Sequence, residues 1–327
     1  MNAHSLFFVV SIACMNSMGA DKAPEITDLG FGTEWLAVNE KGQIAFTATD
    51  SNNMGRQAVL WERGARTNLG FLPGDTASWA ADLNKRGQVV GWSTGTCDRA
   101  FVWQEGVMTP LGGCSTWAAG INDRGEIVGS YYTSSTSHGA AMWQEGKMID
   151  LGVPPSNFGS AARAINEHGQ IVGQYGVNGV SHPFLWDNTH VTDLGLLPGA
   201  YACGATSINN HGQVVGWCFV SGFLRGFLWH KGTMTALDHP AGILGSFAGK
   251  INDHGEIAGY AYGSEFQARA VMWKNGTLID LTTVIAPSAW RLLSAYDIND
   301  HGQVVGLGDV SIPPADYAFQ GFLLDIH

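Results

Sequence analysis

Four side chains of this sequence could carry acid–base chemistry: Arg163, Tyr296, His138 and His182. An enzyme that acts on a polysaccharide uses an arginine to hold a carboxylate and a tyrosine or histidine to move a proton. Their spacing does not show that they converge, because polar residues that occur once in a repeated fold often pair with each other. They are therefore weak candidates for a lyase or hydrolase, and the sequence leans toward a protein without catalysis.

Two local motifs lack the context that their chemistry needs. Residues 91–95 read G-W-S-T-G, but this segment leads from one strand to another, whereas a nucleophile elbow leads into a helix. Residues 297–302 begin like a calcium loop, but His301 replaces an oxygen ligand and Gly308 stands where a glutamate is needed. The repeated turn histidines lie too far apart to share a metal. The sequence therefore predicts no metal site and no cofactor.

The elements that must position any such residues come from internal repetition. A phrase of the form N-x-x-G-[QE]-[IV] recurs about every 43 residues, which is the length of a propeller repeat. Its asparagines are Asn39, Asn84, Asn122, Asn166, Asn209, Asn252 and Asn299. A strand ending in tryptophan and a D-L-G phrase recur in the same order, with the tryptophans at Trp61, Trp103, Trp143, Trp186, Trp229 and Trp273. These tryptophans are expected in the core.

Each unit resolves into four short strands, because β-branched and aromatic residues cluster between Gly, Asn and Asp turns. The asparagine caps its own turn and the glycine supplies a left-handed conformation. We predict an all-β fold, a seven-bladed β-propeller of four-stranded blades over residues 25–327, in which the N-terminal strand completes the last blade. An open solenoid of the same repeats is the alternative, but it requires polar capping units that the sequence lacks.

Three recurring segments resemble the HAF-repeat family, a group of probable extracellular bacterial repeat proteins. They read R-A-F-V-W at residues 99–103, H-P-F-L-W at 182–186 and R-G-F-L-W at 225–229, and D-L-G and I-N-x-x-G phrases accompany such segments. The resemblance covers the chain after residue 25 and implies export and a propeller-like fold. It implies no activity and no catalytic residues. This chain prefers arginine at the first position and lacks the closing glycine at Phe46 and the tryptophan at Leu324.

Composition limits the location and the partners of the protein. An excess of acidic residues gives a formal net charge of −11, which disfavours nucleic acid and acidic membranes as partners. The apolar run at residues 5–14 is too short to span a bilayer, and residues 1–20 are expected to be a signal peptide. Lipoprotein anchoring through Cys14 is a less favoured alternative. We therefore expect a secreted or periplasmic protein, and a monomer because a closed ring has no free edge.

The remaining four cysteines suit an oxidising compartment. Cys203 and Cys218 are nearly symmetric about an asparagine turn, and Cys97 and Cys114 are nearly symmetric about the turn between the third and fourth strands. Three connectivities are possible. The spacing favours Cys97 with Cys114 and Cys203 with Cys218, and four buried thiols are the alternative.

The two kinds of inter-strand connection differ in variability. Turns between the first and second and between the third and fourth strands are short and alike, whereas the connections on the opposite face vary. Because loops on a rigid frame carry binding, we expect a carbohydrate or protein ligand on the variable face. The candidate binding residues are Trp35, Trp79, Trp117, Phe158, Tyr201, Phe247, Trp290 and Arg291. A polysaccharide-active enzyme over the central channel and a structural cell-surface protein are the alternatives.

Overall fold

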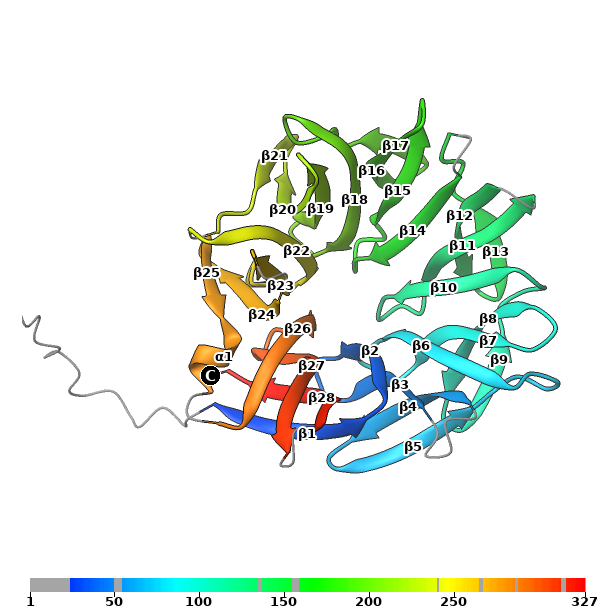
Figure 1. Ribbon diagram of the computed structural model, residues 1–327. Coiled ribbons are helices and arrows are strands. Elements are labelled where there is room, and N and C mark those ends of the chain that lie inside the picture. Colours follow the sequence, from blue (N-terminus) through cyan, green and yellow to red (C-terminus); the bar gives the residue numbers. More distant parts are fainter. Residues whose placement is uncertain are drawn as a thin grey trace, which may run out of the picture.

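The computed structural model describes residues 24–49, 55–134, 137–154, 159–239, 241–264, 267–285, 288–312 and 316–326. Within these ranges, seven four-stranded antiparallel sheets stand around a central axis (Figure 1). This is the predicted seven-bladed β-propeller. The predicted signal peptide, residues 1–20, and Cys14 lie outside the described residues. No helix of the described ranges is long and apolar enough to cross a membrane.

In blades 1 to 6, the four strands follow one another outward from the axis in chain order. Blades 1 to 3 are β2 (Thr33–Val38), β3 (Ile44–Thr49), β4 (Arg56–Glu62) and β5 (Ala65–Gly70); β6 (Ala77–Leu83), β7 (Val89–Thr94), β8 (Asp98–Gln104) and β9 (Val107–Pro110); β10 (Thr116–Ile121), β11 (Ile127–Ser134), β12 (Ser137–Gln144) and β13 (Lys147–Asp150). Blades 4 to 6 are β14 (Ser160–Ile165), β15 (Ile171–Val177), β16 (Val180–Asp187) and β17 (His190–Asp193); β18 (Ala200–Ile208), β19 (Val214–Val220), β20 (Phe223–His230) and β21 (Thr233–Ala236); β22 (Ile243–Ile251), β23 (Ile257–Gly263), β24 (Ala268–Lys274) and β25 (Thr277–Asp280). The short helix α1 (Leu281–Val284) follows, with Asp280 as its N-cap.

Blade 7 joins the two ends of the described chain. It contains β26 (Trp290–Ile298), β27 (Gln303–Ile312), β28 (Asp316–Asp325) and, as its outer strand, β1 (Glu25–Phe31). Strand β1 pairs antiparallel with β28, from Glu25 opposite Asp325 to Phe31 opposite Gln320, and the two lie side by side in Figure 1. This pairing leaves no open edge where the ring closes, as the sequence predicted.

The hydrophobic core is divided among the interfaces between blades. Seven clusters of buried side chains each combine residues of two neighbouring blades. Of the repeated tryptophans, Trp143 and Trp273 are almost fully buried, Trp103 and Trp229 are buried, and Trp61 and Trp186 are half-buried. The core role predicted for this tryptophan position is confirmed most clearly in blades 3 and 6.

The repeated asparagines join each blade to the next. Their Oδ1 atoms accept backbone N–H groups of their own turns, as Asn39 does from Lys41 and Gln43 at 3.0 Å. Each Nδ2 donates to the backbone oxygen of the asparagine in the following blade, at 2.9–3.2 Å in all seven cases. The bond from Asn299 to Asn39 closes the circle. The turn-capping role was predicted from the sequence, whereas the bond to the next blade was not.

Candidate functional site

The innermost strand of each blade lines the central channel, and its register determines which side chains turn toward the axis. Pairing of each inner strand with its neighbour is interrupted by a bulge shortly before the repeated asparagine. Bulges re-aim side chains and are frequent next to functional sites. In blades 4 and 7 the bulge residues are Arg163 and Tyr296, whereas blades 2, 3, 5 and 6 have Ala81, Ala119, Thr206 and Gly249 there.

At the end of the channel formed by the asparagine turns, which we call the turn end, charged side chains satisfy one another. Asp82, Lys250 and Asp297 line a cavity of about 170 Å³. Lys250 Nζ in blade 6 lies 3.6 Å from Asp82 Oδ1 in blade 2. Asp82 Oδ2 accepts the backbone N–H of Ile121 at 3.1 Å, and Asp297 Oδ2 accepts that of Val38 at 3.0 Å. These residues therefore join blades.

Burial and mutual attraction set the titration of this group. Desolvation raises the pKa of Asp297 to about 6, although Lys250 and the N–H groups of Val38 and Ile298 act to lower it. Desolvation alone would lower the pKa of Lys250, but Asp297 and Asp82 outweigh it and the lysine pKa is raised. The turn end thus holds a lysine cation between two carboxyl groups.

A second ring of contacts surrounds the mouth of the turn end. It is made by the residues that directly follow the asparagines. Backbone N–H groups of six of them donate to the side chain of the equivalent residue in the next blade, as Lys85 does to Asp123 Oδ1 at 2.8 Å. Because the side-chain oxygens are used as acceptors, these contacts stabilise the ring. They agree with the prediction that this face is scaffold.

At the opposite end, which we call the open end, a cavity of about 510 Å³ lies between blades 3, 4 and 5. It is larger than the cavity at the turn end and has mixed polar and aromatic walls. Its lining residues are Ser130, His138, Gly159, Ser160, Ala161, Arg163, Gln174, Tyr175, Gly176, Gly179, Ser181, Tyr201 and Ala202. Pockets of this size hold small ligands.

Small residues at one repeated position contribute to the space of this cavity. Five residues before the asparagine, blades 2, 3 and 6 carry Trp79, Trp117 and Phe247, whereas blades 4 and 5 carry Ala161 and Gly204. A β-carbon at Gly204 would lie 2.5 Å from Gln174 Oε1, so a larger residue there would displace this cavity-lining amide. Blades 7 and 1 also lack an aromatic residue at this position, where they carry Ser294 and Glu34, so this position alone does not locate the cavity in the sequence.

Arg163 is a cationic side chain of the cavity, and the described residues offer it no counter-ion. Among the described residues, no carboxylate and no hydrogen-bond acceptor pairs with its guanidinium, and the residues that line the cavity include no carboxylate. Partial desolvation inside the ring lowers the pKa of Arg163. An arginine held in this way is suited to binding an anionic group from outside the protein.

The four catalytic candidates do not gather in one place. Arg163 and His138 line the open cavity, whereas His182 and Tyr296 do not belong to its lining. His182 Nδ1 lies 2.9 Å from Asp193 Oδ2 of the same blade, and Tyr175 Oη donates to the same oxygen at 3.1 Å. Desolvation raises the pKa of Tyr175 to about 12 and also raises that of Tyr296.

The candidate binding aromatics form separate pairs along the inner strands. Trp79 stacks on Trp92 with ring centroids 5.6 Å apart, and Phe247 stacks on Tyr260 at 5.2 Å. The other pairs are Trp117 with Tyr132 at 5.0 Å, Tyr201 with Phe219 at 5.7 Å and Trp290 with Phe322 at 6.4 Å. Arg291 pairs with Asp309, and Phe158 lies outside the described residues. Of these candidates, Tyr201 alone lines the open cavity.

Trp35 is exposed because blade 1 departs from the repeat. In the other six blades, the closing glycine lies so near the inner strand that a β-carbon would come 1.9–2.1 Å from a backbone oxygen. Phe46 replaces this glycine in blade 1, and the pairing there skips from Glu34 to Ala37. Trp35 consequently adopts φ +54° and is 57% exposed. Its ring contacts Trp92 edge-on at 6.3 Å.

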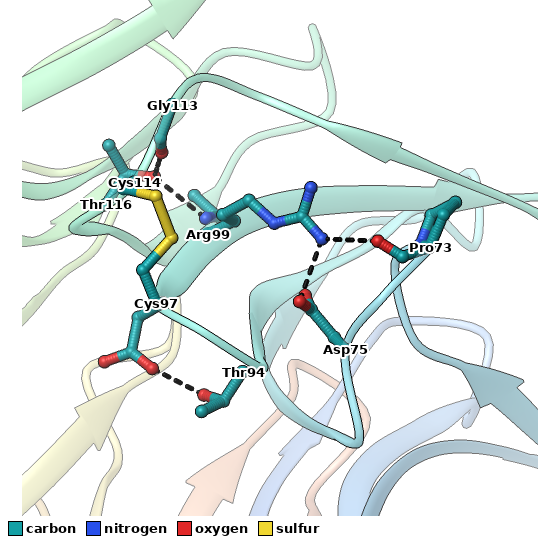
Figure 2. Close-up of a disulfide and its surroundings, with 10 residues drawn as sticks. Pro73, Asp75, Thr94, Cys97, Arg99, Gly113, Cys114 and Thr116 are labelled. Carbon is teal, nitrogen blue, oxygen red and sulfur yellow. Dashed lines mark hydrogen bonds and ion pairs between the residues drawn. A yellow bond between two sulfur atoms is a disulfide. The ribbon is translucent and has the colours of Figure 1, made fainter.

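Two disulfides brace the open end, and both pairings favoured by the spacing are confirmed. Cys203 and Cys218 lie directly opposite each other on β18 and β19. Cys97 and Cys114 join the loop before β8 to the loop after β9, as Figure 2 shows. Beside this bridge, Arg99 donates to Asp75 and to the backbone oxygen of Pro73, both at 2.9 Å (Figure 2).

Comparisons with known proteins establish the fold alone. No family model and no curated protein matches the sequence. Among solved structures, the β-propeller domain of the Trilobed protease from Pyrococcus furiosus is similar (TM-score 0.56, 11% identity, 76% of this chain and 81% of that one). An acylaminoacyl peptidase from Pyrococcus horikoshii is similar as well (TM-score 0.52, 12% identity, 86% of this chain). The chain spans 51% of that peptidase's length. Among the described residues, no group of three His, Cys, Asp or Glu side chains could hold a metal.

Proposed function

We propose that this propeller is a binding protein whose ligand is a carbohydrate held in the open cavity between blades 3, 4 and 5. The observation that carries the proposal is the cavity itself, about 510 Å³ in volume and lined by hydroxyl, amide, histidine and tyrosine side chains. Sugars combine polar hydroxyls with apolar C–H faces, so a wall that mixes hydrogen-bonding groups with aromatic rings suits them.

Tyr201 is the aromatic residue that we assign to the sugar face. Its side chain is 56% exposed at the cavity, and its position is held by stacking on Phe219. Aromatic rings supply contact area at low cost in conformational entropy. A protein partner is less favoured, because protein interfaces are broad surfaces with apolar centres, whereas this site is concave and partly polar.

The composition of the cavity favours binding over turnover. Glycoside hydrolysis uses a pair of carboxyl groups on either side of the scissile bond, and the described residues that line the cavity include no carboxyl group. Arg163 and His138 alone of the four catalytic candidates are present there. The polysaccharide-active alternative would therefore have to work with Arg163, His138 and the tyrosines Tyr175 and Tyr201, which also line the cavity.

The export of the protein belongs to the same proposal. Two disulfides fit an oxidising compartment, and the resemblance to HAF repeats points in the same direction. We propose a secreted or periplasmic monomer that meets free or surface-bound glycans. Cell fractionation followed by titration of free thiols in denatured, unreduced protein tests this. A cytosolic location with four reactive thiols in the mature chain would contradict it.

The test of the carbohydrate proposal is a glycan array probed with the parent protein, Tyr201→Ala and Trp35→Ala. The two aromatics have almost equal exposure, 56% and 57%, but only Tyr201 lines the cavity. We expect at least one glycan to bind the parent, Tyr201→Ala to weaken that binding at least tenfold, and Trp35→Ala to bind like the parent.

Three results would overturn the proposal. They are the absence of any glycan hit, retention of full binding by Tyr201→Ala, or conversion of the bound glycan into a product in a turnover assay. The last result would favour the enzyme. Thermal unfolding of each variant shows whether a loss of binding follows from a loss of fold.

A further inference from the structure

Arg163 differs from the arginines around it. Four others near the open side of the ring pair with carboxylates: Arg56 with Glu34 at 3.1 Å, Arg99 with Asp75 at 2.9 Å, Arg269 with Asp280 at 3.4 Å, and Arg291 with Asp309. No such pair involves Arg163 anywhere in the described residues. Within the described residues, exposed cations such as Arg63 and Lys231 also lack a carboxylate partner, but Arg163 is the cation that lines the open cavity.

The fold places this cation in the cavity by means of the bulge. Pairing between β14 and β15 passes from Ala162 to Ala164, and Arg163 is the residue left between them. The equivalent residues in the neighbouring blades are Ala119 and Thr206, which are short. Thr206 Oγ1 is already bonded to backbone oxygens of Val215 and Ala248, at 3.1 and 2.8 Å. The guanidinium therefore faces the cavity without a neighbour that can neutralise it.

The surroundings of Arg163 select the kind of anion. Its guanidinium is a planar fork that matches a carboxylate through two parallel hydrogen bonds. A phosphate or sulfate, with three terminal oxygens, would favour a lysine or a second arginine beside Arg163. The described residues that line the cavity include neither. Ser130 and Gln174 supply neutral polar groups to the same wall. A single guanidinium fork surrounded by neutral polar groups is suited to binding one carboxylate.

We propose that the open cavity binds an acidic sugar, such as a uronic acid, and that Arg163 pairs with its carboxylate. This inference rests on the proposed carbohydrate function and narrows it to carboxylated glycans. The pairing would replace the counter-ion that other arginines of this face find within the protein. It would also let an acidic protein recognise an acidic ligand, because the attraction is local and the remaining surface charge acts against nonspecific anions.

The first experiment uses the same glycan array. The glycans that bind most tightly are expected to carry a carboxylate. Their methyl esters, which keep the sugar skeleton and remove the charge, are then measured by calorimetry and are expected to bind at least tenfold more weakly. Binding of the acid is expected to weaken as salt is raised, because charge pairing is screened.

Variants of Arg163 assign the effect to this residue. Arg163→Gln is expected to abolish the preference for the acid over the ester, and Arg163→Lys to restore it in part. Arg86→Gln is the matched control, because Arg86 is an exposed residue of an asparagine turn at the opposite end of the ring. It is expected to keep the full preference. Circular dichroism and thermal unfolding verify that every variant is folded.

Each outcome decides the inference. Neutral glycans as the best binders, or an acid preference that persists in folded Arg163→Gln, overturn the carboxylate assignment and leave the proposed carbohydrate function standing. Tighter binding of a sulfated than of a carboxylated form of the same sugar overturns it as well. If no glycan binds at all, both this inference and the proposed function fail.

Discussion

The two ends of the central channel use the same inner strands in different ways. At the turn end, seven equivalent asparagines bond blade to blade, and the singular residues Asp82, Lys250 and Asp297 satisfy one another. At the open end, the singular residue Arg163 has no partner within the described chain, and small side chains in blades 4 and 5 leave a cavity. In the ring of Figure 1, contacts between blades thus hold the turn end together, and the candidate cavity lies at the open end.

This difference shows how a repeat protein acquires a site. A position that is occupied alike in all blades makes a ring of equal contacts, and equal contacts stabilise without selecting a ligand. A position that changes in one or two blades breaks the ring locally. Where the changed residues pair with each other, as Lys250 does with Asp82, the result is structural. Where a changed residue leaves an unpaired charge beside a cavity, as Arg163 does within the described residues, the result is a candidate site.

The largest expected effect comes from breaking the asparagine ring. In Asn209→Ala, the N–H groups of His211 and Gln213 and the backbone oxygen of Asn252 all lose a partner. Each unmade bond in a buried region costs about 1–3 kcal/mol, so the free energy of unfolding should fall by roughly 3–4 kcal/mol. Urea denaturation measures this change.

A matched substitution shows whether the loss of stability comes from the asparagine ring or from the replacement of any asparagine. Asn68 is exposed on β5, and Asn68→Ala should change the free energy of unfolding by less than about 0.5 kcal/mol. Folded Asn209→Ala should still bind the ligand of the open cavity. If both substitutions had the same small effect, the turn end would not be the structural end of the channel.

Much of this fold follows from the sequence because the repeat states it seven times. The asparagine spacing gave the number of blades, the unpaired first strand gave the closure of β1 on β28, and symmetric spacing gave both disulfides. Each of these depends on local turn geometry and on counting. None of the three requires knowledge of which side chains meet across the channel.

The site was harder to predict because it depends on distances between blades. The candidate residues included Arg163, His138 and Tyr201, which line one cavity, together with His182 and Tyr296, which do not line it. Sequence position cannot distinguish them, because Arg163 and Tyr296 occupy the same bulge position in blades 4 and 7 and yet only Arg163 lines the cavity. The inter-blade donor bonds of the asparagines were also missed, because a turn motif reveals its own hydrogen bonds and not those of the next repeat.

A smaller effect should appear as a pH dependence of stability at the turn end. The pKa of Asp297 is raised from 3.8 to about 6, so between those values the folded protein holds a proton that the unfolded chain releases. Stability from this residue is therefore present at low pH and is lost as the pH rises from about 4 to 6. At about 1.4 kcal/mol per pKa unit, the loss is on the order of 3 kcal/mol.

Replacement of the carboxyl group tests this sign. Asp297→Asn should flatten the profile of unfolding free energy between pH 4 and 6, whereas Glu62→Gln, which changes an exposed carboxylate on β4, should leave it unchanged. Urea denaturation at a series of pH values provides the measurement. An unaltered slope in Asp297→Asn would mean that the buried carboxyl is ionised throughout and that Lys250 dominates its titration.

The smallest change in the free energy of unfolding is expected at Trp35, an aromatic residue of the inner strand that contributes little to stability. Its φ of +54° costs a non-glycine residue roughly 1–2 kcal/mol, and its edge contact with Trp92 returns about 0.5–1.5 kcal/mol. Trp35→Gly removes both, so the free energy of unfolding should change by less than about 1 kcal/mol. Trp273→Ala, in contrast, empties a core position that is 1% exposed and should cost about 3–5 kcal/mol. If Trp35→Gly cost as much as Trp273→Ala, Trp35 would be part of the scaffold and the distortion of blade 1 by Phe46 would be a packing device.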